Sequence, residues 1–319
     1  MSGFRFTRDQ RRVLYAICAA ILLFIIGQIV RPGFGSAQGI ESVLVVASFV
    51  GFVAAGQMFV ILIGGIDLSV PWVLNAAAII MVTVTRGTDG LLLLGLVATL
   101  GAGALVGLIN GIGVARFRVP AVVMTLAMNG IMEGLTLGQS GGITCQACAS
   151  YAPPLVQLAV HGHLLGIPAV LYVWLLVILV VSFVLSSTTF GRATYAVGNS
   201  ALVSYLAGLR VSGVTIALYT LSGIFSALAG IMLVGFGGQA SLGMGDPYLF
   251  QSIAAVVIGG VYIFGGRGSY VGTVAGAVTL VALVSVLLAL NMPDYGRNIV
   301  YGVTILALLL AYGREEEER

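Results

Sequence analysis

Long apolar runs alternate with short polar connections along almost the whole chain. A helix needs ~20 predominantly apolar residues to cross a bilayer, and ten runs come close to that length. They are 13–30, 42–63, 70–85, 91–114, 119–138, 164–186, 214–236, 248–264, 269–290 and 296–312. No small-x-small cleavage site follows the first run, so it is expected to be a retained span and not a signal peptide. The pattern predicts an all-α polytopic membrane protein, one domain over residues 1–319, with about ten transmembrane helices.

The composition supports a membrane protein and narrows its chemistry. Hydrophobic residues make up 59% of the 319 residues, charged residues only 8%, and the mean hydropathy is +1.11. The 45 glycines fit helices that pack closely through small residues in lipid. All 14 basic residues are arginine, which excludes a phosphate-binding P-loop lysine or a Schiff-base lysine. Any ATP used by this protein must therefore be hydrolysed on another chain.

Arginine placement predicts the orientation. With the N-terminus inside, three arginines lie outside: Arg31, Arg86 and Arg297. The cytoplasmic segments then hold Arg5, Arg8, Arg11, Arg12, Arg116, Arg118, Arg192, Arg210, Arg267, Arg314 and Arg319. This bias satisfies the positive-inside rule. Both ends are expected in the cytoplasm, with residues 1–12 as the N-terminal segment, 187–213 as an inner loop and 313–319 as the tail.

A glycine pair interrupts the chain between the second and third apolar runs. Gly64 and Gly65 are followed by Asp67 and Ser69 before the next run begins. Irregular backbone at membrane depth persists only where protein or a water-filled cavity satisfies its polar groups. We therefore interpret this break as functional. Asp67 is a candidate gate or pathway carboxylate, or a cap for the amides of the following helix, and the two roles are compatible.

Several polar residues lie inside the predicted spans, where leaving them in contact with lipid would be unfavourable. Together with the residues of the glycine break they form the candidate translocation pathway or gate: Gln57, Asp67, Ser69, Asn75, Asn110, Thr125, Asn129 and Glu133. Hydrogen bonding between helices is the alternative role for the intramembrane members. Glu133 is expected near the outer end of its span, facing a cavity or a helix end.

Two connections are long enough to hold structure. The outer one, 139–163, contains Cys145 and Cys148, which are structural or incidental, or else form a strained disulfide; His161 and His163 lack a third ligand nearby, and no metal site is expected. In the inner one, Asn199 or Ser200 is placed to cap a short helix that Gly208 ends. A short amphipathic helix on this side of a many-span protein predicts docking to a partner.

The chain also contains a weak internal echo. Residues 60–65 with Ser69 and Val70 are similar to residues 261–266 with Ser269 and Val271. Each follows an inward-running span and precedes one rich in alanine and glycine. Repeats are common in transporters, although glycine-rich helices also produce such echoes by chance.

Four ordered blocks resemble the inner-membrane permeases of ribose-type sugar ATP-binding-cassette importers. They are Gly64–Val70, Asn110–Pro120 with Thr125-Leu126, Gly191–Leu209, and Ile253–Gly260 continuing to Thr273. The resemblance covers nearly the whole chain. It departs from the family at Pro71, where glycine is usual, and in 200–205, where no carboxylate stands for an acid–arginine pairing with the ATPase.

The resemblance implies a bacterial inner-membrane permease that carries a sugar or related polyol inward by alternating access. It implies a second permease subunit, a separate ATPase that holds ATP and Mg, and a periplasmic solute-binding protein, with no cofactor on this chain and no nucleic acid. The residues expected to couple to the ATPase are Arg192, Asn199, Ser200, Tyr205, Ala207, Gly208 and Arg267.

Three other functions fit the sequence less well. An ion-coupled carrier usually has chains of buried acids and histidines, whereas Glu133 is almost the only mid-span acid here. A permease for branched-chain amino acids or nucleosides should present charged partners or stacking aromatics, and neither stands out. A membrane enzyme lacks a catalytic constellation in this sequence.

Overall fold

A computed structural model describes residues 8–142, 151–293, 295–297, 299–303 and 306. Cys145, Cys148 and the predicted cytoplasmic tail lie outside these residues, as does most of the last predicted span.

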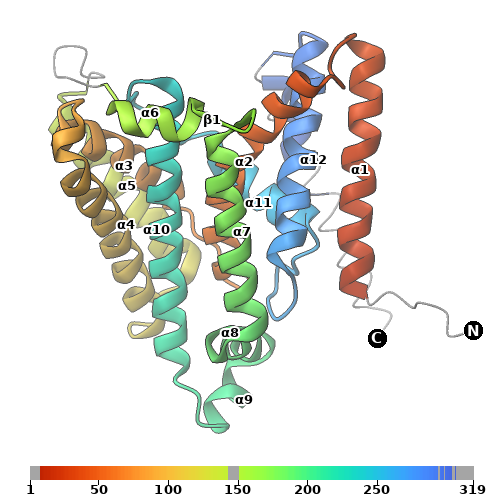
Figure 1. Cartoon of the computed structure of the whole chain (residues 1–319). Coiled ribbons are helices and arrows are strands. Elements are labelled where there is room, and N and C mark those ends of the chain that lie inside the picture. Colours follow the sequence, from red (N-terminus) through yellow and green to blue (C-terminus); the bar gives the residue numbers. More distant parts are fainter. Residues whose placement is uncertain (1–7, 143–150, 294, 298, 304–305, 307–319) are drawn as a thin grey trace, which may run out of the picture.

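The described chain is almost entirely helical (Figure 1). Its long helices are α1 (Arg8–Val30), α2 (Ala37–Ile61), α4 (Leu92–Ala115), α5 (Ala121–Ser140), α7 (Ala169–Ser187), α10 (Val211–Gly237) and α12 (Tyr270–Ala289). The shorter elements are α3 (Val70–Thr85), the 3-10 turn η1 (Asp89–Leu91), α6 (Pro154–His161), β1 (His163–Leu164), β2 (Ile167–Pro168), α8 (Thr189–Asn199), α9 (Ala201–Leu206) and α11 (Tyr248–Ile258).

The predicted helical membrane fold is confirmed in its coarse form. Seven helices in the described part of the chain are long and apolar enough to cross a membrane, and α3 and α11 are shorter apolar helices. The predicted run 248–264 is helical only to Ile258, because Gly260 adopts a left-handed φ of 83° and turns the chain. The predicted run 164–186 begins later, at Ala169, because β1 and β2 form a hairpin first.

The buried centre of the bundle is α2, which packs against α10, α11 and α12, while α1 lies at the edge against α12. A row of glycines in α4 brings it close to α10. A methyl group at Gly103 or Gly107 would clash with the carbonyl oxygens of Gly223 or Tyr219, respectively. Small residues at four-residue spacing let two helix backbones approach closely in membranes, so the high glycine content has the expected packing role.

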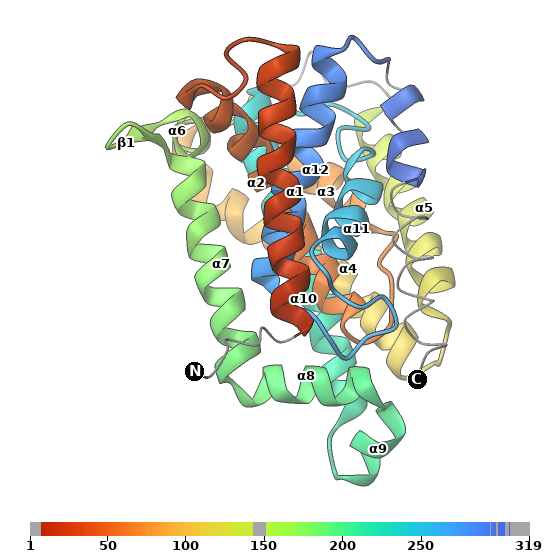
Figure 2. The same ribbon diagram turned by 90° about the vertical axis from the view of Figure 1, so that its right-hand side faces the viewer.

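The two ends of the bundle differ. One end carries α8 and α9, together with the α4–α5 and α11–α12 connections, and α8 runs across this end with α9 beyond it (Figure 2). The opposite end carries α6 and the β1–β2 hairpin. There His161 Nε2 lies 3.0 Å from the carbonyl oxygen of Phe236, and His163 pairs with Glu41 at 3.5 Å. The two histidines therefore face different partners.

Candidate functional site

The segment after α2 folds into an irregular, partly buried connection. The helix ends at Ile61, Gly64 takes a left-handed φ of 75°, and α3 begins at Val70. The absence of a side chain at Gly65 matters sterically, since a Cβ there would lie 2.5 Å from the Tyr219 hydroxyl oxygen on α10. The glycine pair thus lets the chain turn and pass close to α10.

Asp67 is the centre of a hydrogen-bond network within this connection. Its Oδ1 accepts hydrogen bonds from the Ser69 amide at 2.9 Å and the Ser69 hydroxyl at 2.6 Å. Its Oδ2 accepts one from the Ser222 hydroxyl of α10 at 2.7 Å. The Ser69 oxygen in turn accepts from Asn110 Nδ2 of α4 at 2.9 Å. The network therefore ties the α2–α3 connection to two other helices.

Helix α5 also contacts the α2–α3 connection. The Thr125 hydroxyl oxygen of α5 lies 3.2 Å from the carbonyl oxygen of Ile66 and 2.9 Å from that of Ala121 in its own helix, so its single proton can be donated to either. Asp67 is only 1% exposed, and Ser69, Asn110, Thr125 and Ser222 are buried as well. No arginine or histidine lies within ion-pair distance of Asp67 in the described part of the chain. Hydroxyl and amide donors alone compensate the buried carboxyl group.

Polar atoms around this network remain unpaired. The side-chain amide of Gln57, Oδ1 of Asn110 and the hydroxyl of Tyr219 are buried and have no hydrogen-bond partner among the described residues. Buried polar groups are usually satisfied by protein or by ordered water. These atoms are thus suited to hold water or to find partners in another arrangement of the helices.

The structure brings together only some of the predicted pathway residues. Asp67, Ser69, Asn110 and Thr125 meet at the α2–α3 connection. Ser69, not Asp67, is the N-cap residue of α3, so the predicted capping by Asp67 is limited to the amide of Ser69. The cause is spacing, because Asp67 lies two residues before the cap position.

The remaining pathway candidates lie elsewhere. Asn75 binds the connection 238–247, with its amide oriented to donate to the Ser241 carbonyl at 3.0 Å and to accept from the Gly243 amide at 2.7 Å. Asn129 Oδ1 is buried and has no partner among the described residues. Glu133 is close enough to Asp246 to raise the pKa of that carboxyl, although burial of Asp246 is the larger cause.

The predicted short inner helix is present as α9. The Ser200 hydroxyl caps it by accepting from the Val203 amide at 3.3 Å, and Gly208 follows with a left-handed φ of 84°. Arg192, Asn199, Tyr205, Ala207, Gly208 and Arg267 are exposed, and Ser200 is half-buried. Leu206 is 75% exposed, and Leu202, Val203 and Tyr205 are similarly open, so α9 presents an apolar surface.

Sequence reasoning missed α8, which precedes α9. Thr188 caps it by accepting from the Gly191 amide at 3.2 Å. Gly191, Thr194 and Val197 are its buried residues, spaced three apart as on one helix face. The threonine cap and this spacing were the signals available in the sequence.

The end of α8 rests on both glycine-rich turns. The Gly266 amide donates to the Leu62 carbonyl oxygen at 2.8 Å, so the two halves of the internal echo lie side by side. Gly198 fits against Leu62 and Gly266 so tightly that a Cβ there would clash with the Leu62 carbonyl oxygen. The Tyr195 hydroxyl donates to the Gly268 carbonyl at 2.8 Å, and Asn199 Nδ2 donates to that of Gly266 at 3.3 Å.

These contacts form a continuous connection from the surface to the buried carboxyl group. The apolar surface of α9 leads through Ser200 into α8, and α8 contacts the turn that begins at Leu62. That turn continues into Asp67, which Ser222 of α10 binds, and Ser69, which Asn110 of α4 binds.

Comparison with known proteins gives a consistent result. Residues 39–309 match the model of a family described as branched-chain amino acid transport system / permease component. The ribose import permease protein RbsC of Haemophilus influenzae is 33% identical over 310 residues, covering 96% of this chain and 94% of that protein. RbsC of Escherichia coli K12 is 31% identical over 317 residues, 99% of this chain and 98% of that protein.

A third relative differs in its named solute. The autoinducer 2 import system permease protein LsrC of Escherichia coli K12 is 30% identical over 310 residues, which is 97% of this chain and 89% of that protein. No solved structure matches the chain.

Proposed function

This chain belongs to the family of branched-chain amino acid transport system permease components, and from that premise we propose that it moves a sugar or sugar-like solute inward through an ATP-binding-cassette importer. It is a multi-pass inner-membrane transport subunit, not an enzyme. ATP and Mg are proposed to bind the partner ATPase, because this chain has no lysine for a P-loop.

The observation that carries the mechanism is the seating of α8 on both glycine-rich turns. Gly198 contacts Leu62 and Gly266 without space for a side chain, so a displacement of α8 would displace the segment that contains Asp67. We propose that ATPase movement reaches the solute path in this way. Asp67, Ser69, Asn110 and Thr125 would then form a gate that exchanges hydrogen-bond partners between the two states of alternating access.

The surface proposed to receive the ATPase is α9. Four of its six residues have large hydrophobic side chains that are exposed: Leu202, Val203, Tyr205 and Leu206. A short amphipathic helix can place such residues in a groove of a partner. Arg192, Arg210 and Arg267 are exposed at the same end of the bundle and would add attraction for acidic groups. No carboxylate lies in α9, so an acid–arginine pair supplied from this helix is not part of the proposal.

The orientation proposed here places α8 and α9 in the cytoplasm. The α4–α5 connection, with Arg116 and Arg118, lies at that end, whereas Arg31 lies at the other end, as the positive-inside rule requires. Ten spans, with both termini cytoplasmic, would follow if residues 296–312 form the last one. A second permease subunit and a periplasmic solute-binding protein complete the proposed complex, with lipid around it.

A polyhydroxylated solute is favoured over an amino acid. RbsC is named for ribose and LsrC for autoinducer 2. The proposed gate consists of hydroxyl and amide groups around one carboxyl group, with no cation within ion-pair distance in the described residues. A zwitterionic amino acid would need partners of both charges, whereas a sugar needs hydrogen-bond donors and acceptors.

Purification from native membranes in mild detergent tests the mechanism class. Mass spectrometry should find a stoichiometric ATP-binding-cassette ATPase with this chain, and the other membrane subunits would distinguish a homodimer from a pair of paralogues. If no ATPase is recovered even after crosslinking, the proposal fails, and an ion-coupled carrier with Glu133 as the residue to mutate becomes the better hypothesis.

Competition between solutes tests the proposed solute class. Solute uptake by the complex reconstituted with its ATPase should be inhibited by excess ribose and not by excess leucine.

Substitutions in α9 test the docking surface. Leu202→Ser with Leu206→Ser should weaken ATPase association at least tenfold, because apolar contact area is lost, while the thermal stability of the isolated subunit stays unchanged. Leu165→Ser is the matched control, since Leu165 is 91% exposed at the opposite end, in the β1–β2 hairpin. ATPase association that survives the double substitution would refute docking through α9.

A further inference from the structure

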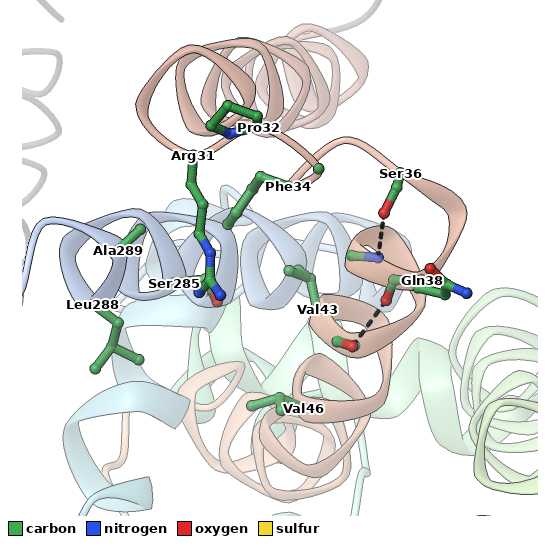
Figure 3. A pocket seen from close by; sticks show the side chains of 13 residues that line it. Arg31, Pro32, Phe34, Ser36, Gln38, Val43, Val46, Ser285, Leu288 and Ala289 are labelled. Atoms are coloured by element: carbon green, nitrogen blue, oxygen red, sulfur yellow. Dashed lines mark hydrogen bonds between the residues drawn. The ribbon is translucent and has the colours of Figure 1, made fainter.

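A pocket of about 530 Å³ lies where α1 ends, α2 begins and α12 ends. Figure 3 shows Arg31 extending from the α1–α2 connection toward Ser285 of α12, and both residues line the pocket. The ends of three membrane-spanning helices meet here, at the end of the bundle away from α8 and α9. The pocket therefore lies at one end of the long apolar helices, where a lipid headgroup region is expected.

The pocket carries a positive charge that the protein does not neutralise. Among the described residues the Arg31 guanidinium has no hydrogen bond or ion pair, and no acidic residue lines the pocket. The nearest acid along α2, Glu41, pairs instead with His163 at 3.5 Å. An arginine fork with no carboxylate partner is suited to a phosphate group, which it can bind through two parallel hydrogen bonds.

Further hydrogen-bond donors face the same space. The Ser36 oxygen accepts a bond from the Gly39 amide at 3.2 Å, which leaves its hydroxyl proton free to donate. Ser285 and Gln38 line the pocket too, and no bond from either side chain to a described residue is present. Ser42 differs, because its hydroxyl proton is already donated to the Gln38 carbonyl at 2.8 Å. The Arg31 guanidinium only donates, and the free hydroxyl groups of Ser36 and Ser285 can also donate, as an anion that only accepts requires.

Most of the remaining lining is apolar, and part of it is exposed. Val43 is buried in the pocket, whereas Val46 and Leu288 are more than a third exposed. A small inorganic anion makes no use of such a wall. A ligand with a phosphate group attached to hydrocarbon chains would satisfy both the donors and the apolar side chains.

We propose that this pocket binds the phosphodiester headgroup of a membrane phospholipid in the leaflet away from α8 and α9. Arg31 holds the phosphate, with Ser285 and Ser36 as further donors. The acyl chains lie along Val46 and Leu288. The bound lipid thereby links α1 and α2 to α12. This site is independent of the proposed transport function, since it shares no residue with Asp67 and its partners.

Native mass spectrometry of the purified chain, titrated with phosphatidylglycerol, tests the proposal. Arg31→Gln should weaken binding about fivefold, because one arginine near a lipid phosphate contributes ~1 kcal/mol. Diacylglycerol, which lacks the phosphate, should bind equally to both proteins. Arg86→Gln is the matched control, since Arg86 is exposed at the same end of the bundle but outside the pocket. Equal phosphatidylglycerol binding by the Arg31 variant and wild type would overturn the proposal.

Two further measurements identify the occupant. Ser285→Leu fills the pocket while Arg31 is retained, so lipid binding should fall in this variant too; unchanged binding would mean that Arg31 attracts lipid from outside the pocket and would also overturn the proposal. Millimolar inorganic phosphate should not displace phosphatidylglycerol. Complete displacement by phosphate would identify a free-anion site and reject a lipid site.

Discussion

The main-chain amide of Gly266 donates a hydrogen bond of 2.8 Å to the carbonyl oxygen of Leu62. This bond joins two glycine-rich turns that lie far apart along the chain and have similar sequences. Gly198 of α8 fits onto the pair. Because Leu62 begins the connection to Asp67, α8 packs directly on the segment that leads to the buried carboxyl group.

The close fit of Gly198 predicts a strong effect of one methyl group. Gly198→Ala should destabilise the protein by about 1–3 kcal/mol through overlap with the Leu62 carbonyl oxygen. Gly213→Ala in α10 is the control. The nearest atom to its added methyl is Arg210 Cβ at 3.8 Å, so a neutral or slightly stabilising effect is expected. Thermal unfolding in detergent measures both, and equal melting temperatures would contradict the close fit.

Removing the Asp67 carboxyl group should leave several buried donors unpaired. Asp67→Leu removes the acceptor for the Ser69 amide, the Ser69 hydroxyl and the Ser222 hydroxyl, and should destabilise by about 3 kcal/mol or more. Asp67→Asn keeps one acceptor oxygen and should be milder.

Ser226→Ala provides the comparison for Asp67. Its hydroxyl bonds only the Ser222 carbonyl of its own helix, at 2.8 Å, so the loss should be about 1 kcal/mol at most. Chemical denaturation or thermal unfolding can rank the three variants. An Asp67→Leu variant as stable as Ser226→Ala would show that the network contributes little.

Replacement by leucine should destabilise the protein locally at Asn75 but not at Asn129. Asn75→Leu leaves the Gly243 amide and the Ser241 carbonyl without a partner, so the connection 238–247 should loosen and be cleaved faster in limited proteolysis. Asn129→Leu removes a buried oxygen that has no partner among the described residues and should be neutral or stabilising. Identical cleavage rates in the two variants would contradict the assigned role of Asn75.

Asp246 should make stability depend on pH. Burial, and to a lesser degree the Glu133 carboxylate, raise the pKa of Asp246 in the folded protein above its ordinary value of about 3.9. Protonation therefore favours folding, and this contribution is present below about pH 4 and is lost as the pH rises through the folded pKa. Asp246→Asn should melt higher than wild type at neutral pH, with the difference disappearing toward pH 4.

Glu133→Gln provides a check on the cause. It should act in the same direction as Asp246→Asn with a smaller effect, because burial is the larger contribution. A lower melting temperature for Asp246→Asn at pH 7 would show that the carboxylate has a stabilising partner.

Ser222 is a residue of the site that the sequence did not reveal. Amides and acids inside apolar helices stand out in a sequence, and Asn110 was found in this way. A helical serine gives no such signal, because its hydroxyl commonly bonds a carbonyl of its own helix, as Ser226 does. Ser222 instead reaches Asp67, and only the packing of α10 against the α2–α3 connection makes that bond possible.

What the sequence determined by itself was local: the apolar helices, the glycine break at Gly64, and α9 between Ser200 and Gly208. Helix periodicity, caps and left-handed glycines act over a few residues, so a sequence can specify them without knowledge of the fold. Only the tertiary structure decided that Leu62, Gly198 and Gly266 meet, that α10 binds Asp67, and that α4 binds Ser69. Contacts between residues far apart in the chain depend on how whole helices pack, which no local pattern encodes.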